Sequence, residues 1–294
     1  DKLETDQNPY LAGKIMASLF YEPSTRTRLS FESAMLRLGG SVISTENARE
    51  FSSAAKGETL EDSIQVINHY ADIIVLRHFE LGSAARAAKV SHIPIINAGD
   101  GAGQHPTQAL LDLYTINREL KRVDDLKIAL VGDLKNGRTI RSLAYLFGKF
   151  SDIFIYFVSP KELAVSEDIL SYLNRHGVHY EEINDLNAII SRVDVVYQTR
   201  IQKERFSDPE EYNRLNGCYI IDWALAEMMK PDSIIMHPLP RVNEILPAVD
   251  NNPRAVYFKQ AYYGVLVRMA LLYMILVKSG SKHLPFSEIA NLRS

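Results

Sequence analysis

The sequence predicts an α/β protein of two domains, each a parallel sheet flanked by helices. Short, continuously apolar runs alternate with helical patterns along the chain, which is typical of strands buried on both faces of parallel sheets. The chain has 294 residues, 46% of them apolar, enough for two domains with separate cores. A charged segment, residues 118–125, precedes a new apolar strand and marks the expected boundary, with the first domain ending at about 121 and the second starting at about 122.

The individual elements follow from apolar runs for strands and from 3.6-residue periodicity for helices. The expected strands are Lys14–Phe20, Ser41–Thr45, Ile73–Leu76, Ile93–Asn97, Lys127–Gly132, Ile153–Val158, Val193–Gln198, Tyr219–Asp222 and Ser233–Met236. The expected helices include Thr25–Leu38, Thr59–Tyr70, Gln108–Leu120, Ile140–Phe150, Glu167–His176, Pro209–Asn216 and Ala261–Val277. By its pattern alone, the last helix could pack on either domain.

Composition excludes several classes of protein. The net charge of −3 gives no reason to expect a nucleic-acid partner. The single cysteine, Cys218, excludes internal disulfides and a cysteine-rich zinc site, and fits a reducing, cytoplasmic compartment. No signal peptide is visible, although the sequence starts at Asp1 rather than Met. The apolar run Tyr262–Val277 contains Arg268 and is short for a bilayer, so we expect a buried core helix and no membrane partner.

The segment FYEPSTRTRLSFE carries the clearest chemical signal. It places three hydroxyls and two guanidiniums where a helix is predicted to begin, at Ser24, Thr25, Arg26, Thr27 and Arg28. A helix N-terminus exposes free N–H groups and the positive end of the dipole, which bind anions. An ordinary N-cap would need only one hydroxyl. The segment therefore favours a phosphate site.

Polar residues recur directly after the predicted strands. Ligands of parallel α/β sheets bind beyond the carboxyl ends of the strands, so these residues are candidates for one functional region. They are Arg26, Arg77, His78, His105, Gln108, Arg138, Arg200, Gln202 and His237. Four arginines in such positions indicate a doubly anionic ligand or two anionic ligands.

Two glycine-rich segments resemble nucleotide motifs without matching them. Residues 132–139, GDLKNGRT, come close to a P-loop, but Arg138 stands where the P-loop has lysine. The segment GDGAG, residues 99–103, has the wrong spacing for a dinucleotide site and more simply forms a tight turn. A P-loop nucleotide hydrolase stays an alternative that Arg138 disfavours.

Three further motifs each have a structural and a functional interpretation. His105-Pro106-Thr107-Gln108 opens a helix, where the imidazole and amide either cap it or donate toward a carbonyl oxygen. In HPLPR, residues 237–241, the prolines either stiffen a loop or present the carbonyls of Pro238 and Leu239 to an amine. The loop of residues 52–58, with Lys56, is on its own an ordinary solvated loop.

Together these motifs resemble the aspartate/ornithine transcarbamoylase family over nearly the whole chain. The matching marks, in order, are FYEPSTRTRLSFE, KGE, LRH, GDGAGQHPTQALLDLYTI, VGDLKNGRT, QTRIQKER and HPLPRVNEI. Ornithine enzymes carry SMG and HCLP motifs, whereas this chain lacks SMG and has His237-Pro238-Leu239. Arg200 also suits the side-chain carboxylate of aspartate rather than the ammonium of ornithine.

The resemblance implies transfer of a carbamoyl group from carbamoyl phosphate to the α-amine of L-aspartate, an early step of pyrimidine synthesis, without metal or cofactor. It assigns residues 1–121 plus 262–294 to carbamoyl phosphate and 122–261 to aspartate. The catalytic set is Arg26, Thr27, Arg77 and His105. The implied carbamoyl phosphate contacts are Ser24, Thr25, Arg26, Thr27, Arg77, His105, Gln108, Ser52 and Lys56. The implied aspartate contacts are Lys56, Arg138, Arg200 and Gln202, with backbone carbonyl contacts from Pro238 and Leu239.

The resemblance also implies an assembly. Ser52 and Lys56 reach into a neighbouring subunit's site in this family, so we expect a homotrimer with shared active sites. Some members bind a zinc-bearing regulatory chain, which makes such a chain a candidate partner. Three alternatives stay open: a transcarbamoylase for ornithine or a related amine, a non-catalytic family member, and the nucleotide hydrolase.

Overall fold

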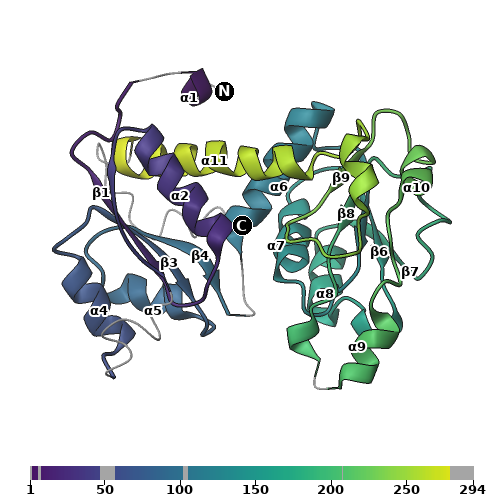
Figure 1. The fold of residues 1–294 in the computed structure, drawn as a ribbon, viewed down its shortest axis with the longest axis horizontal. Coiled ribbons are helices and arrows are strands. Elements are labelled where there is room, and N and C mark those ends of the chain that lie inside the picture. The colour runs from purple at the N-terminus through teal and green to yellow at the C-terminus, as the bar shows by residue number, and fades with distance from the viewer. Residues whose placement is uncertain (1, 6–7, 47–56, 102–104, 207, 279–294) are drawn as a thin grey trace. The chain divides into compact units, whose positions relative to one another are not determined.

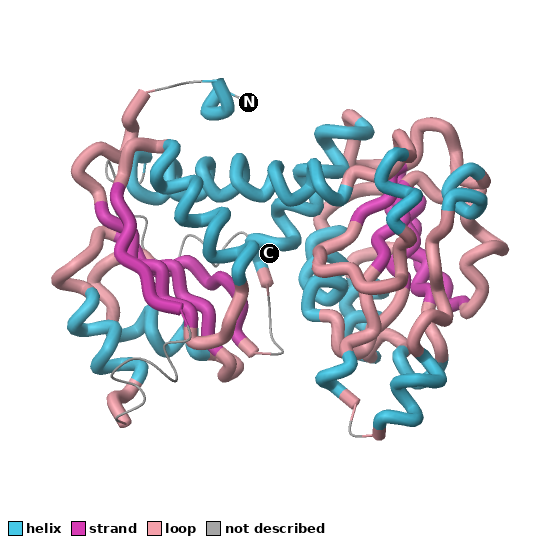
Figure 2. The backbone as a smooth tube through the Cα atoms, viewed as in Figure 1, coloured by secondary structure: helices cyan, strands magenta, loops and turns pink. Residues whose placement is uncertain are grey.

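The computed structural model describes residues 2–5, 8–46, 57–101, 105–206 and 208–278 of the chain. The chain forms two compact units, which Figure 1 shows as ribbons. The first comprises residues 1–107 and 264–294, and the second comprises residues 108–263. The strands of each unit form one sheet (Figure 2, magenta), and every strand pairing is parallel.

The first unit contains a four-stranded sheet in the order β2-β1-β3-β4. The inner strands are almost wholly buried because both faces of the sheet are covered by helices. Ala17 and Leu19 pack on one face with Leu60 and Ile64. The strands are β1 (Ile15–Phe20), β2 (Ser41–Glu46), β3 (Ile73–His78) and β4 (Ile95–Asp100).

Helices α4 and α5 lie on one side of this sheet, and α2 with the end of α11 lies on the other (Figure 1). On the second side, the guanidinium of Arg268 in α11 lies 5.0 Å from the ring centroid of Phe31 in α2. The C-terminal helix thus packs on the first unit, as expected. The helices are α1 (Lys2–Thr5), α2 (Thr25–Arg37), α4 (Leu60–Ile67), α5 (Ser83–Val90) and α11 (Tyr257–Tyr273).

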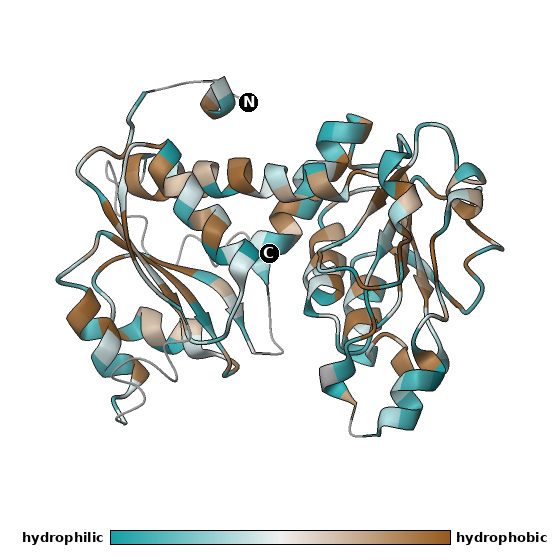
Figure 3. Ribbon diagram, in the orientation of Figure 1, coloured by the Kyte–Doolittle hydropathy of each residue, from teal (hydrophilic) through white to brown (hydrophobic). Residues whose placement is uncertain are grey.

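The second unit contains a five-stranded sheet in the order β7-β6-β5-β8-β9. Alternate residues of β5 pack into two separate apolar clusters, one on each face. Figure 3 shows the apolar colouring concentrated along these strands. The strands are β5 (Leu126–Val131), β6 (Ile153–Val158), β7 (His179–Ile183), β8 (Val195–Gln198) and β9 (Ile234–Met236). The helices are α6 (Pro106–Leu120), α7 (Arg138–Phe147), α8 (Glu167–Arg175), α9 (Pro209–Leu215) and α10 (Trp223–Glu227).

Two elements differ from the sequence-based expectation. The expected strand Tyr219–Asp222 is wrong: Ile221 makes only an isolated bridge to Ile245, and the Asp222 side chain caps α10 by accepting from the backbone N–H of Leu225 at 2.8 Å. Strand β7 was not expected. It lies at the sheet edge and exposes most of its residues, so it lacks the apolar run of an inner strand.

The compact units divide at residues 107 and 108, earlier in the chain than the expected boundary near 121. The reason is α6, whose Ile116 is buried in a core cluster of the second unit. Gln108 therefore belongs to the second unit, although it lies before the boundary expected from the sequence. The second division of the chain lies after Tyr263.

One helix of the described residues, α11 with its π-helical continuation Met274–Lys278, is long and apolar enough to cross a membrane by length and composition alone. Its side chains nevertheless contribute to the protein core: Leu266, Met269 and Leu272 are buried. Arg268, which interrupts its apolar run, is also buried. One third of the apolar window, 33%, is buried, so the core-helix interpretation stays a prediction.

Candidate active site

The N-terminus of α2 is built as the sequence predicts. Strand β1 ends at Phe20, Ser24 is the N-cap, and Thr25 begins the helix. The Ser24 hydroxyl donates to the Thr27 hydroxyl oxygen at 3.1 Å, and the first turn contains no acidic residue. The helix therefore presents free N–H groups, hydroxyls and Arg26 with no acidic residue in its first turn, which suits a phosphate.

Arg77 ends up beside this helix start because β1 and β3 are neighbours in register, with Phe20 opposite Arg77. The backbone N–H of Tyr21 donates to the carbonyl of Arg77 at 2.9 Å. The Arg77 side chain is buried, and its Nη2 donates to Glu22 Oε1 at 2.9 Å. This ion pair holds a guanidinium at the strand end without removing its charge.

His105 reaches the same edge of the first unit through β4. Residue His78 of β3 pairs with Asp100 of β4, and the N–H of Gly101 donates to the carbonyl of His78 at 2.9 Å. His105 then directly precedes α6 and is buried. The predicted residues of the first unit thus lie at or after the carboxyl ends of three adjacent strands, β1, β3 and β4.

Two predicted residues, Ser52 and Lys56, lie outside the described residues. His78, the last residue of β3, has a local role. Its Nδ1 accepts from the backbone N–H of Glu80 at 3.1 Å, and its ring lies 4.3 Å from that of Phe79, centroid to centroid.

In the second unit, Arg138 begins α7 after the turn that leaves β5. Gly132 in this turn has φ 113°, and a Cβ there would lie 2.4 Å from the carbonyl oxygen of Thr199. The P-loop-like segment is therefore packed against the backbone that precedes Arg200. Thr199 is itself anchored to β5, because its N–H donates to the carbonyl of Val131 at 2.8 Å.

Asp133 connects this turn to the Gln202 segment. Its buried carboxylate accepts from the backbone N–H of Asn136 at 3.0 Å and also from the backbone N–H of Gln202. Burial raises the pKa of Asp133, while these hydrogen bonds and the charge of Arg205 oppose the rise. Arg138, Arg200 and Gln202 thus follow the neighbouring strands β5 and β8 and are held near one another by Gly132 and Asp133.

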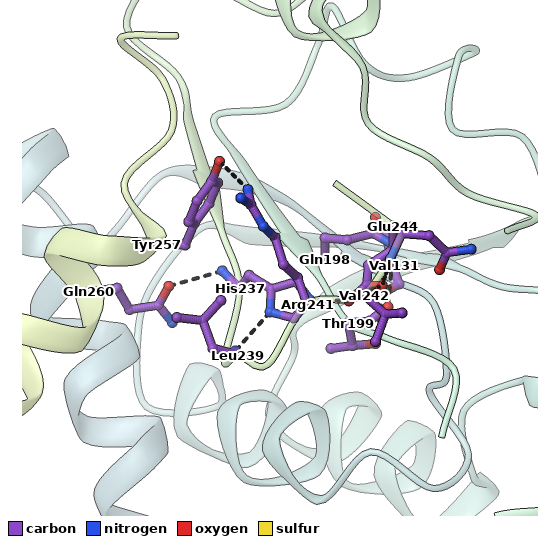
Figure 4. Close-up of polar contacts among 11 residues, drawn as sticks. Val131, Gln198, Thr199, His237, Leu239, Arg241, Val242, Glu244, Tyr257 and Gln260 are labelled. Atoms are coloured by element: carbon purple, nitrogen blue, oxygen red, sulfur yellow. Dashed lines mark hydrogen bonds and ion pairs between the residues drawn. The ribbon is translucent and has the colours of Figure 1, made fainter. Parts of the chain in front are cut away.

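The HPLPR loop is fixed mainly through His237, which is buried (Figure 4). Its backbone N–H donates to Gln260 Oε1 at 2.9 Å, and its Nδ1 accepts from the N–H of Leu239 at 2.7 Å. A ring nitrogen that accepts carries no proton, so Nε2 is the donor in its 2.7 Å contact with Glu244. The imidazole is fully used in holding the loop.

Glu244 and Asp250 complete the support of this loop. Burial opposes ionisation of Glu244, but hydrogen bonds from His237 and from the backbone N–H of Val242 hold its pKa below the ordinary value. Arg241 pairs with Asp250, with Nη2 2.6 Å from Oδ2, and donates to the Tyr257 hydroxyl at 3.0 Å. The carbonyls of Pro238 and Leu239 are therefore part of a rigid loop.

Comparison with known proteins decides the family. The family model described as "Aspartate/ornithine carbamoyltransferase, carbamoyl-P binding domain" matches residues 1–118, and "Aspartate/ornithine carbamoyltransferase, Asp/Orn binding domain" matches residues 124–275. The chain belongs to the aspartate/ornithine carbamoyltransferase family.

Relatives in this family are closely similar. The chloroplastic aspartate carbamoyltransferase of Arabidopsis thaliana is 59% identical over 280 residues, 94% of this chain and 72% of the relative. The aspartate carbamoyltransferase catalytic subunit of Methanothrix thermoacetophila is 58% identical over 266 residues, 90% of this chain and 86% of the relative.

Solved structures agree in fold. The catalytic subunit of aspartate transcarbamoylase from M. jannaschii matches with a TM-score of 0.89 and 52% identity, covering 96% of this chain and 92% of that chain. Aspartate transcarbamoylase from Trypanosoma cruzi, in complex with carbamoyl phosphate and aspartate, matches with a TM-score of 0.87 and 42% identity, covering 93% and 88%. The predicted family and fold class are confirmed.

Sequence reasoning missed a buried polar group in the carbamoyltransferase fold. Gln108 Nε2 donates to Asp112 Oδ1 at 2.9 Å, and Asp112 also contacts Tyr197 and Gln260. The one available signal was an aspartate inside the apolar helical pattern ALLDLY. Among the described residues, no group of three histidine, cysteine or acidic side chains is arranged to hold a metal ion.

Proposed function

We infer that the chain transfers the carbamoyl group of carbamoyl phosphate to the α-amine of L-aspartate, giving N-carbamoyl-L-aspartate and phosphate. One observation carries this conclusion: hydroxyls, guanidiniums and an imidazole follow the carboxyl ends of three adjacent strands in a chain of this family. Relatives named aspartate carbamoyltransferase and a neighbour in complex with both substrates support it.

The first unit binds and activates carbamoyl phosphate in this proposal. Ser24, Thr25, Arg26 and Thr27 hold the phosphate at the start of α2. Thr27, Arg77 and His105 donate to the carbonyl oxygen, where negative charge develops as the carbon becomes tetrahedral. Because such donors act most strongly on the transition state, loss of one costs about 10²–10³ in rate.

The second unit binds aspartate in this proposal. Arg138, Arg200 and Gln202 hold its two carboxylates, for which the guanidinium fork has suitable geometry. Gln108 and the carbonyls of Pro238 and Leu239 accept hydrogen bonds from the carbamoyl NH₂ or the attacking amine.

The chemical step needs no protein base. The α-amine nitrogen forms a bond to the carbonyl carbon, the bond from that carbon to the phosphate oxygen breaks, and the amine proton passes to the departing phosphate. Catalysis then depends on placing the two substrates and on stabilising the oxyanion.

The reaction and its rival are separated by measuring phosphate release with carbamoyl phosphate and either aspartate or ornithine. We expect release with aspartate only. Arg200→Ala is expected to lower kcat/KM for aspartate by about 10- to 100-fold, because a hydrogen bond to a charged group contributes about 1.5–3 kcal/mol. Arg214→Ala, which removes an exposed arginine paired with Glu162 at 3.2 Å, is the control.

If the protein released phosphate with ornithine and not with aspartate, ornithine would be the substrate in place of aspartate. No phosphate release with either amine would leave the non-catalytic family member as the better interpretation. Binding of ATP in place of carbamoyl phosphate would favour the nucleotide hydrolase, which Arg138 disfavours.

We also propose the assembly that the resemblance implies: a homotrimer in which Ser52 and Lys56 of one chain complete the carbamoyl phosphate or aspartate contacts of another. A regulatory chain is a further candidate partner. A cytoplasmic location also stays a prediction, and several close relatives are named as chloroplastic.

A further inference from the structure

The second unit contains a carboxylate that is completely buried and accepts from three side chains. Asp112 lies on α6 and has no exposed surface. Its Oδ1 accepts from Gln108 Nε2 at 2.9 Å and from Gln260 Nε2 at 2.7 Å. Its Oδ2 accepts from the Tyr197 hydroxyl at 2.7 Å. Such a group is costly to bury, and satisfying it with three donors fixes all of them.

We propose that Asp112 and Tyr197 are positioning residues for the reaction: they orient the carboxamides of Gln108 and Gln260 so that one accepts from substrate and the other holds the HPLPR loop. This proposal rests on the proposed function. Neither residue touches substrate in it.

The first branch fixes Gln108. A carboxylate only accepts hydrogen bonds, so the Gln108 group that faces Asp112 must be the NH₂. The same NH₂ group also donates to the Tyr197 hydroxyl oxygen. Because the NH₂ group is directed toward Asp112, Oε1 is the group of this amide that is left to accept. Gln108 is therefore set to receive a hydrogen bond from the carbamoyl NH₂ or the aspartate amine.

The second branch fixes the loop. Asp112 binds the Gln260 NH₂ at 2.7 Å, which leaves Gln260 Oε1 to accept from the backbone N–H of His237 at 2.9 Å. Figure 4 shows this last contact beside the one from Leu239 to His237. The position of the Pro238 and Leu239 carbonyls therefore depends in part on the Gln260 amide, whose direction Asp112 sets.

Tyr197 connects the same centre to the arginine segments. It lies in β8, three residues before Arg200, and its hydroxyl oxygen also accepts from Thr139, the residue after Arg138. Burial, and then the nearby Asp112, raise the pKa of Tyr197 well above its usual value, so its hydroxyl keeps its proton and donates to Asp112. The buried group around Asp112 thus contacts four segments that carry predicted site residues. These residues are Gln108, Arg138, Arg200 and the Pro238–Leu239 pair.

The decisive variant is Asp112→Asn, which keeps the shape but replaces one acceptor by a donor. The new NH₂ group faces either the NH₂ groups of Gln108 and Gln260 or the hydroxyl of Tyr197. In both cases a donor of the wild-type protein loses the carboxylate oxygen that accepts from it. We expect kcat/KM for aspartate to fall by about 100-fold, because a misplacement of about 1 Å can cost that much. KM for carbamoyl phosphate should change less, since its phosphate contacts lie in the first unit and only its carbamoyl NH₂ meets Gln108.

Asp194→Asn is the matched control. Asp194 is also buried, directly precedes β8, and accepts from the backbone N–H of Lys127 at 2.8 Å and from Lys230 Nζ at 2.7 Å. It should lower the unfolding temperature as Asp112→Asn does but leave both kinetic constants unchanged. If Asp112→Asn does not fold, Tyr197→Phe serves as the variant, with the same direction of effect.

A double-mutant cycle separates positioning from general damage. In a Gln108→Ala, Gln260→Ala background, Asp112→Asn should cost little further activity, because the two amides it directs are gone. The proposal is overturned if the loss persists in full there, or if Asp112→Asn and Asp194→Asn have equal kinetic constants. An inactive wild-type chain would instead overturn the proposed function.

Discussion

Three histidines lie at or after strand ends among the described residues, and their side-chain contacts give them different roles. Nδ1 of His78 and of His237 accepts a backbone N–H within a turn, at 3.1 and 2.7 Å. Nδ1 of each is thereby committed to local structure, and in His237 Nε2 is engaged as well, by Glu244. His105, at the start of α6, is the histidine left as a candidate donor to the carbonyl oxygen. By their position in the sequence alone, the three histidines could not be told apart as candidate donors.

The Glu244 carboxylate makes acid stability testable at the scale of one residue. Its pKa is lowered in the folded state, so its contribution to stability is present above its ordinary value of 4.5 and is lost as the pH falls through the folded pKa. Glu244→Gln should therefore lower the free energy of unfolding most at neutral pH. The deficit relative to wild type should shrink as the pH falls below 4.5. Urea denaturation across this range measures it.

Glu182→Gln, an exposed change on β7, is the control and should leave the pH profile unchanged. A Glu244→Gln deficit that stays constant from neutral to acid pH would show that ionisation of this carboxylate does not contribute.

Among the elements, the turn after β5 links local backbone shape to the aspartate contacts. Gly132 adopts φ 113° against the Thr199 backbone, and Asp133 accepts from the N–H of Gln202. The sequence motif here looks like a phosphate loop, yet its glycine allows close packing of two strand ends instead. Arg138 and Arg200 follow these two strands.

Gly132→Ala should therefore weaken aspartate binding as well as stability. The φ strain alone costs about 1–3 kcal/mol, and the new methyl group would lie 2.4 Å from the Thr199 oxygen, which must move. Gly177→Ala is the matched control, since Gly177 also has a positive φ, 68°, but no atom lies within 4 Å of its added Cβ. Thermal unfolding and aspartate KM measure the two effects. Equal results for both variants would mean that the Thr199 contact is unimportant.

For the whole molecule, the proposed trimer predicts complementation between defective chains. Arg26→Ala removes a phosphate contact and Lys56→Ala removes a group supplied to a neighbouring subunit, so each protein alone should be nearly inactive. Mixing them with subunit exchange should restore part of the activity, because some sites then receive intact groups from both chains. Phosphate release by the mixture is the measurement.

Each variant after the same exchange treatment alone is the control for this experiment. Hybrids that form, as shown by mass, but release no phosphate would contradict shared sites. A chain that is fully active as a monomer would contradict the trimer itself.

The sequence by itself determined the fold class, most strands and helices, and the residues that follow the strands. These features depend on short-range patterns of apolar residues and on motifs that stay contiguous in the chain. The edge strand β7 and the buried group around Asp112 depended on tertiary structure. Asp112 and Gln260 are separated by 148 positions, and Tyr197 lies on another element. Hydrogen bonds between such distant residues leave no local pattern in the sequence. Whether an aspartate in a helix faces water or orients buried neighbours is decided by its burial in the folded chain.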